Sequence, residues 1–104
     1  MSVVSDSDKI LSRLFGSVSR ARILEFLLSR SGRAYYQREI MYETGLTLQP
    51  TQRELKNLLD LGIIKKRETA EKVYYEIDTL SLFFKPLREI FGSVPRLSKK
   101  GILG

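Results

Sequence analysis

The stretch at 36–61, YQREIMYETGLTLQPTQRELKNLLDL, constrains the possible fold more than any other part of the chain. Its pattern predicts two helices joined by a tight turn, the first at about 37–44 and the second at about 47–61. Gly45 supplies the turn, because glycine adopts a positive φ without a steric penalty. Thr47 follows with a hydroxyl that can accept a hydrogen bond from a free N–H group of the second helix. The stretch therefore has the layout of a helix-turn-helix unit.

The predicted second helix separates its residues between two faces. Steps of three and four predict a buried stripe of Leu48, Thr51, Leu55, Leu58 and Leu59. The other face carries hydrogen-bond donors and positive charge, from Gln49, Gln52, Arg53 and Lys56. In a helix-turn-helix unit this helix lies in the major groove of DNA, where such groups contact base edges and phosphates. The alternative is an ordinary amphipathic helix whose polar face is only solvated.

Two predicted strands follow Gly62, which ends the second helix. The segment at 63–68 begins with two isoleucines, and the segment at 73–78 is rich in valine, tyrosine and isoleucine. A polar connector at 69–72 joins them, so the pattern predicts a β-hairpin. The run at 34–36, Ala-Tyr-Tyr, predicts a further short strand before the helical pair.

Two helices are predicted before this central part. The first begins at Asp6, which can cap it, and ends at Gly16. The second is capped by Ser17 or Ser19 and ends near the Ser-Gly pair that follows it. The apolar residues of this second helix form an inner face, which leaves Arg20 on the outer face.

The last predicted helix follows Thr79, which can cap it. Pro86 lies in its range, so the helix proper either begins near Phe84, with the proline in its first turn, or is kinked. Gly92 is expected to end the helix. The residues at 92–104 are small, polar and basic, and we expect them to form a flexible tail.

The composition limits the possible functions. Lys and Arg number 18 and Asp and Glu 12, and the net charge of +6 favours a polyanionic partner such as nucleic acid or an acidic lipid surface. The chain has no cysteine and no histidine, which excludes Cys/His zinc sites and catalytic Ser–His or Cys–His pairs. No carboxylate pair suited to a catalytic Mg²⁺ follows the glycine-serine sequence at 16–17. We therefore expect no enzymatic activity, no metal and no cofactor.

The chain shows no sign of a membrane or export segment. No stretch approaches the ~18 apolar residues of a membrane span. The start, MSVVSDSDK, carries acidic residues and no apolar run, unlike a signal peptide. We expect a cytoplasmic protein with one domain at 6–91.

Three strings of the sequence resemble a known family: LFGSVSRARILEFLL, YYQREIMYETGLTLQPTQRELKNLLDLGIIKKRE and VYYEID. Together they resemble the winged helix-turn-helix transcriptional regulators of the ArsR/MarR-like group of bacteria and archaea. The most specific part is ETGLT followed by TQREL-x-NLLDLGIIKKR. The resemblance implies an α+β fold of order α-α-β-α-α-β-β-α, with a three-helix core, a β-hairpin wing and extra N- and C-terminal helices. It also implies a homodimer that binds double-stranded DNA.

The candidate DNA contacts extend beyond the second helix. Gln37 and Arg38 begin the first helix of the unit, whose free N–H groups suit a phosphate. The cations of the hairpin can neutralise further phosphates. The full set is Gln37, Arg38, Thr47, Gln49, Thr51, Gln52, Arg53, Lys56, Lys65, Arg67 and Lys72. The alternatives are that Arg53 pairs with Glu54, Asn57 or Asp60, and that the hairpin cations are only solvated.

The resemblance assigns the dimer contact to the terminal helices. The residues expected there are Ile10, Leu11, Leu14, Phe83, Leu87, Ile90 and Phe91. Two other functions stay open. The hairpin connector ETAEK, at 68–72, contains two acids and favours a protein–protein interaction module that does not bind DNA. RNA binding through the same basic face is the other possibility.

Overall fold

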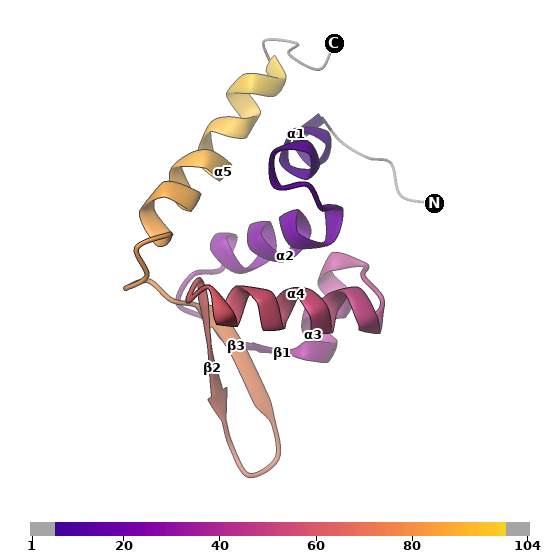
Figure 1. The fold of residues 1–104 in the computed structure, drawn as a ribbon, viewed down its shortest axis with the longest axis vertical. Coiled ribbons are helices and arrows are strands. Elements are labelled where there is room, and N and C mark those ends of the chain that lie inside the picture. Colours follow the sequence, from indigo (N-terminus) through magenta and orange to yellow (C-terminus); the bar gives the residue numbers. More distant parts are fainter. Residues whose placement is uncertain (1–5, 100–104) are drawn as a thin grey trace.

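The computed structural model describes residues 6–99, which contain five helices and a three-stranded antiparallel sheet in an α+β arrangement (Figure 1). The elements in chain order are α1 (Asp6–Phe15), α2 (Val18–Ser29), β1 (Tyr35–Tyr36), α3 (Gln37–Thr44), α4 (Leu48–Asp60), β2 (Ile64–Glu68), β3 (Val73–Ile77) and α5 (Phe84–Lys99). The order of helices and strands is the one predicted from the sequence. It places α3, α4 and the β2–β3 hairpin one after another in the middle of the chain.

The helix ends near the centre of the chain follow the local sequence. Ser17 Oγ accepts the N–H of Arg20 at 3.1 Å, which confirms Ser17 as the cap of α2. Gly45 follows α3 with a φ of 72°, and its N–H donates to the Met41 carbonyl at 2.9 Å. The predicted turn is therefore confirmed. Thr47 occupies the N-cap position of α4, but its side chain makes no capping hydrogen bond, so that expectation is wrong.

Alanine substitutions at two glycines should have opposite effects on stability. Gly45 has a φ of 72°, whereas Gly92 lies inside α5, and an added Cβ meets no atom closer than 3.9 Å at either position. Gly45→Ala should lower the free energy of unfolding by about 1–2 kcal/mol, because a left-handed conformation strains any residue with a Cβ. Gly92→Ala should raise it by about 0.5–1 kcal/mol, because alanine favours helix. Urea unfolding measures both; equal effects of the two would contradict the turn at Gly45.

The sheet has the strand order β1-β3-β2 with both pairings antiparallel, which confirms the predicted hairpin and the short strand before it. At the base of the hairpin Ile64 pairs with Ile77, and both side chains are buried. At its tip the N–H of Thr69 donates to the Lys72 carbonyl at 2.8 Å. The hairpin extends away from the helices, below α4 in the view of Figure 1.

The main hydrophobic core lies between α2, α3, α4 and the base of the hairpin. Each helix contributes a residue with no exposed surface: Ile23 from α2, Ile40 from α3 and Leu58 from α4. Burying an aliphatic side chain of this size stabilises a fold by about 1.5–3 kcal/mol. These contacts hold α3 and α4 in a fixed relative position.

The start of α5 distinguishes the two possibilities that the sequence left open. The helix begins at Phe84, whose N–H donates to the Ser81 carbonyl at 3.1 Å. Pro86 falls in its first turn, where its missing N–H leaves no intrahelical bond unmade. Thr79, the predicted cap, lies in the turns before the helix, so that prediction is wrong.

The far end of α5 differs from the prediction. The helix passes through Gly92 and continues to Lys99 instead of ending at the glycine. Packing explains the difference, because Val94 is buried against Leu11 of α1 and Ala21 of α2 in a second small core cluster. The remaining part of the predicted tail, 100–104, lies outside the described residues. Over residues 6–99, no helix is both long enough and apolar enough to cross a membrane.

Candidate nucleic-acid interface

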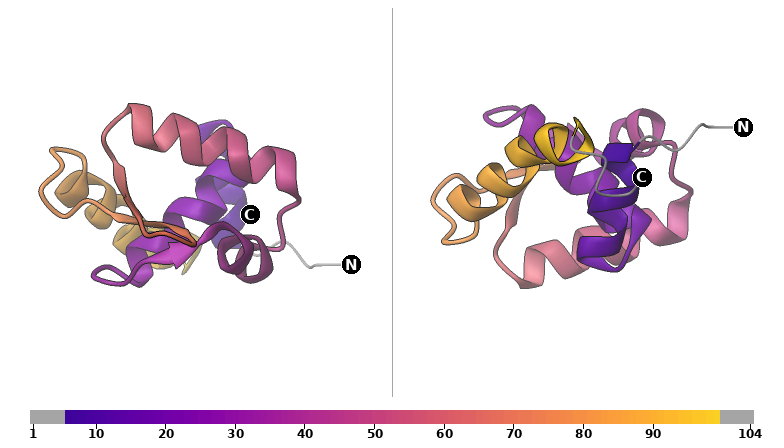
Figure 2. Two further views of the ribbon diagram at one scale, coloured as in Figure 1. Left: turned by 90° about the horizontal axis from the view of Figure 1, so that it is seen from below. Right: turned by 90° about the horizontal axis from the view of Figure 1, so that it is seen from above.

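The outward face of α4 carries four polar side chains. Gln49, Gln52, Arg53 and Lys56 are all exposed, and their spacing of three and four residues places them on one face of the helix. In both views of Figure 2, α4 lies at the edge of the molecule, and no other helix or strand of residues 6–99 covers its outward side. The structure thus brings together the four residues that the sequence assigned to the outer face. We call these four residues the α4 ridge.

The inward face of α4 differs from the predicted stripe at Leu48. Leu55 and Leu58 are buried as expected, but Leu48 is 48% exposed. Thr51 is 0% exposed, and its hydroxyl donates to the Thr47 carbonyl at 2.8 Å. Thr51 therefore packs inside the protein, and its assignment as a DNA contact is wrong.

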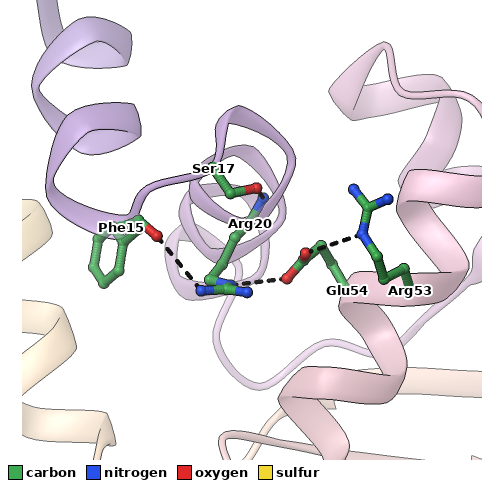
Figure 3. Close-up of polar contacts among 5 residues, drawn as sticks. All are labelled: Phe15, Ser17, Arg20, Arg53 and Glu54. Atoms are coloured by element: carbon green, nitrogen blue, oxygen red, sulfur yellow. Dashed lines mark hydrogen bonds and ion pairs between the residues drawn. The ribbon is translucent and has the colours of Figure 1, made fainter.

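Glu54 is a buried residue that the sequence analysis missed. It is 3% exposed, and its Oε1 accepts a hydrogen bond from Arg20 Nε at 2.8 Å (Figure 3). Arg20 was expected on the outer face of α2 but lies half-buried between helices. The same guanidinium donates through Nη1 to the Phe15 carbonyl at 3.4 Å, so this one arginine contacts both the end of α1 and α4.

Two residues of the α4 ridge have acidic neighbours. Arg53 Nε lies 3.5 Å from Glu54 Oε2, and the Arg53 side chain remains 65% exposed. Lys56 Nζ lies 2.9 Å from Asp60 Oδ2, with both side chains exposed to solvent. An exposed pair such as Lys56–Asp60 typically contributes about 0–1 kcal/mol and leaves Lys56 free to exchange partners, whereas Arg53 faces a carboxylate that is itself buried.

A shallow pocket lies where the N-terminus of α3 meets β3. It is lined by Tyr36, Gln37, Arg38, Lys72, Val73 and Tyr75. Arg38 is exposed and makes no ion pair within the part of the chain that the structure describes. Lys72 Nζ lies 4.2 Å from the centre of the Tyr36 ring, a cation–π contact. Gln37 is half-buried, and its amide nitrogen lies 4.0 Å from the sulfur of Met41.

Carboxylates accompany the cations on both faces of the hairpin. Glu76 Oε1 lies 3.4 Å from Lys65 Nζ, and Glu76 Oε2 lies 3.0 Å from Arg67 Nη2. Lys66 Nζ similarly lies 3.2 Å from Glu68 Oε1. Both hairpin cations chosen from strand β2 as phosphate contacts, Lys65 and Arg67, are therefore already paired with one carboxylate.

The residues expected at a dimer contact divide into three groups by exposure. Leu11 and Leu87 are buried within their own chain, so the expectation that they meet a partner is wrong. Phe91 is partly buried and stacks on Phe15 with ring centres 5.5 Å apart. The more accessible residues are Ile10, Leu14, Phe83 and Ile90, and three of these, Ile10, Leu14 and Ile90, line a shallow groove between α1 and α5.

No family model, curated protein or solved structure matches the chain in the three comparisons. Within residues 6–99, no group of three or more Asp and Glu residues is placed to hold a metal ion. The geometry and chemistry of the described side chains are therefore the basis for assigning a function.

Proposed function

We propose that the chain is a sequence-specific regulator that binds double-stranded DNA through a winged helix-turn-helix. In this proposal α3 and α4 are the helix-turn-helix, and the β2–β3 hairpin is the wing. The observation that carries it is the α4 ridge, where four polar residues stand together on an uncovered helix face. A helix with its side chains fits the width of the DNA major groove.

The chemistry of the ridge suits both bases and phosphates. The amides of Gln49 and Gln52 can each donate to N7 and accept from N6 of adenine. Arg53 can donate two hydrogen bonds to guanine, and Lys56 can neutralise a phosphate. Arg38 at the start of α3 adds an exposed cation without an acidic partner among residues 6–99. Three residues of the ridge, Gln49, Gln52 and Arg53, would therefore contact the bases. Lys56 and Arg38 would contact the phosphates.

We further propose that the active species is a homodimer formed through α1 and α5. Leu14, Phe83 and Ile90 expose apolar surface on or next to these helices. A two-fold dimer would carry two copies of α4, and such proteins bind inverted half-sites about 34 Å apart. No effector, metal or cofactor is part of the proposal.

Selection from a library of random duplexes tests the function. The wild-type protein should enrich an inverted repeat, and log K should fall with log salt by about 0.9 for each phosphate neutralised. A structured RNA added as competitor should displace the protein less effectively than the enriched duplex. Enrichment of no duplex sequence at low salt would contradict the proposal, and stronger competition by RNA would favour an RNA ligand.

A second candidate function is a protein–protein interaction module. Leu80 and Leu82 in the turns before α5 are almost fully exposed, and Phe83 is 46% exposed. These neighbouring apolar side chains would suit a protein partner. Sedimentation distinguishes the candidates in part, because a homodimer should show concentration-dependent mass, whereas a monomer at all concentrations would favour a different partner.

Glu76→Gln should strengthen binding to DNA. The Glu76 carboxylate pairs with Lys65 and Arg67, so its removal frees two cations to contact phosphates. We expect roughly tenfold tighter binding at low salt and a salt slope steeper by about 1–2. Titrations of labelled duplex at several salt concentrations measure both quantities. Glu71→Gln removes the same charge at the hairpin tip, where no ion pair is recorded among the described residues, and should leave the slope unchanged; equal slopes for all three proteins would contradict the expectation.

A further inference from the structure

A buried carboxylate lies between two arginines directly behind the α4 ridge. Glu54 belongs to the inward face of α4 and its side chain is only 4% exposed. Figure 3 shows it between Arg20, which comes from α2, and Arg53, which belongs to the ridge. Charged side chains are almost never buried without a partner, because water solvates the charge far better than the protein interior does.

The two carboxylate oxygens have different partners. Oε1 accepts a hydrogen bond of 2.8 Å from Arg20 Nε, which supplies the main compensation for the buried charge. Oε2 faces the other way and lies 3.5 Å from Arg53 Nε. Because Arg20 is itself held by the Phe15 carbonyl, the position of the Glu54 carboxylate is fixed from the side of α1 and α2. Glu54 can therefore hold the Arg53 guanidinium in one orientation.

The contact with Glu54 occupies only one edge of the Arg53 guanidinium. Its two terminal nitrogens, Nη1 and Nη2, point away from the carboxylate in Figure 3. The side chain is 65% exposed, so these nitrogens are accessible from solvent. An arginine that is already oriented loses less rotamer freedom when it binds. Its two terminal nitrogens also stay available as a planar pair of hydrogen-bond donors.

We infer that Glu54 is a positioning residue that orients Arg53 to recognise one guanine in the duplex. This inference rests on the proposed function. Guanine presents O6 and N7 side by side in the major groove, and the two terminal nitrogens of arginine can donate to both. No other base offers two acceptors there, so a held arginine selects guanine. A mobile arginine at the same place would also reach phosphates, which carry no sequence information.

The simpler interpretation is that Glu54 only attaches α4 to α2 through Arg20. The two interpretations predict different results for Glu54→Gln, which keeps the shape but removes the charge. A purely structural role would change the affinity for all duplexes by one common factor. A positioning role would change the preference for guanine at one base pair, while removal of a negative charge near DNA would leave binding to unrelated duplexes equal or stronger.

The experiment compares variants on the duplex enriched by the wild-type protein. The guanine at which Arg53→Lys loses discrimination is taken as the contact, because lysine keeps the charge but lacks the planar fork. At that base pair the wild type should prefer guanine by about 5- to 150-fold over the other bases. Glu54→Gln should reduce the preference to within about threefold, a loss of most of the bidentate contact. Asp60→Asn removes the carboxylate beside Lys56, one helix turn further on, and should leave the preference unchanged.

The possible failures are distinguishable. A folded Glu54→Gln variant with the guanine preference of the wild type would overturn the inference and leave the proposed function intact. If circular dichroism shows that this variant does not fold, Arg53→Lys is the remaining test, because Arg53 is exposed and its replacement does not disturb the core. Retention of every guanine preference by Arg53→Lys would overturn the inference. A wild-type protein that selects no duplex sequence would overturn the proposed function and the inference together.

Discussion

Replacing Gln49 and Arg53 together by alanine should abolish the preference of the protein for its selected duplex. Both side chains are exposed on the α4 ridge, and neither belongs to the core. Each bidentate base contact contributes about 1–3 kcal/mol of discrimination, so the loss of two corresponds to a roughly 30- to 20,000-fold decrease in affinity for that duplex. Titration of the labelled duplex at constant salt measures the effect, and thermal unfolding checks that the fold persists.

Arg88→Ala is the matched control for this prediction. Arg88 lies on α5 beside Phe84, so its replacement removes a positive charge away from the α4 ridge. Loss of one charge should reduce binding to all sequences by a small common factor. If Arg88→Ala weakened binding as much as the double variant does, net charge alone would explain the interaction and the ridge would have no special role.

Leu11→Ala should destabilise the protein far more than Leu14→Ala, although both leucines lie in α1. Leu11 is 1% exposed and packs with Ala21 and Val94, whereas Leu14 is 57% exposed. Truncation of a buried leucine typically costs about 2–5 kcal/mol, because it removes apolar burial and leaves a cavity. Truncation of the exposed leucine should stay within about 0.5 kcal/mol for the monomer. Urea unfolding at low protein concentration measures the difference.

The same two substitutions, Leu11→Ala and Leu14→Ala, distinguish an effect on folding from an effect on self-association. If the homodimer uses the exposed side of α1, Leu14→Ala should raise the dimer dissociation constant measured by sedimentation while the monomer keeps its stability. Equal destabilisation by both substitutions would contradict the packing of α1 against α5. A Leu14→Ala variant that dimerises like the wild type would remove Leu14 from the proposed contact.

The local elements could be predicted because their signals lie within a few residues of each other. Gly45 marks the turn between α3 and α4, since the φ of 72° found there suits glycine. The hairpin follows from two β-rich segments with a short polar connector. The exposed positions of α4 follow from helical periodicity, which placed all four residues of the ridge correctly.

Residues whose environment depends on distant partners could not be predicted in the same way. Glu54 lies three residues after Thr51 and four before Leu58, so its spacing alone indicates the buried face, but its charge suggests solvent. Its partner Arg20 is 34 positions away in the sequence, and only the folded chain brings them together. Leu48 is the first residue of α4 and is 48% exposed, whereas Leu46, two residues earlier, packs against the core.

Contacts between residues far apart in the sequence also explain the length of α5 and the ion pairs of the hairpin cations. Glycine usually weakens a helix, but α5 continues past Gly92 because Val94 packs against Leu11. Glu76 faces Lys65 directly across the hairpin, a pairing that depends on strand register and not on composition. Fewer positive charges of the hairpin are therefore unpaired than its sequence suggests.

The central claim is that the α4 ridge enters a DNA duplex, and nuclear magnetic resonance tests it most directly. The labelled protein is titrated with the selected duplex, and shifts are followed for backbone amides, for the glutamine side-chain amides and for the Arg53 Nε–H. We predict that the largest shifts occur at Gln49, Gln52, Arg53 and Lys56, with smaller shifts at the start of α3 and in the hairpin. Shifts confined to α1 and α5, or a bound spectrum in which these four residues are unchanged, would contradict the claim.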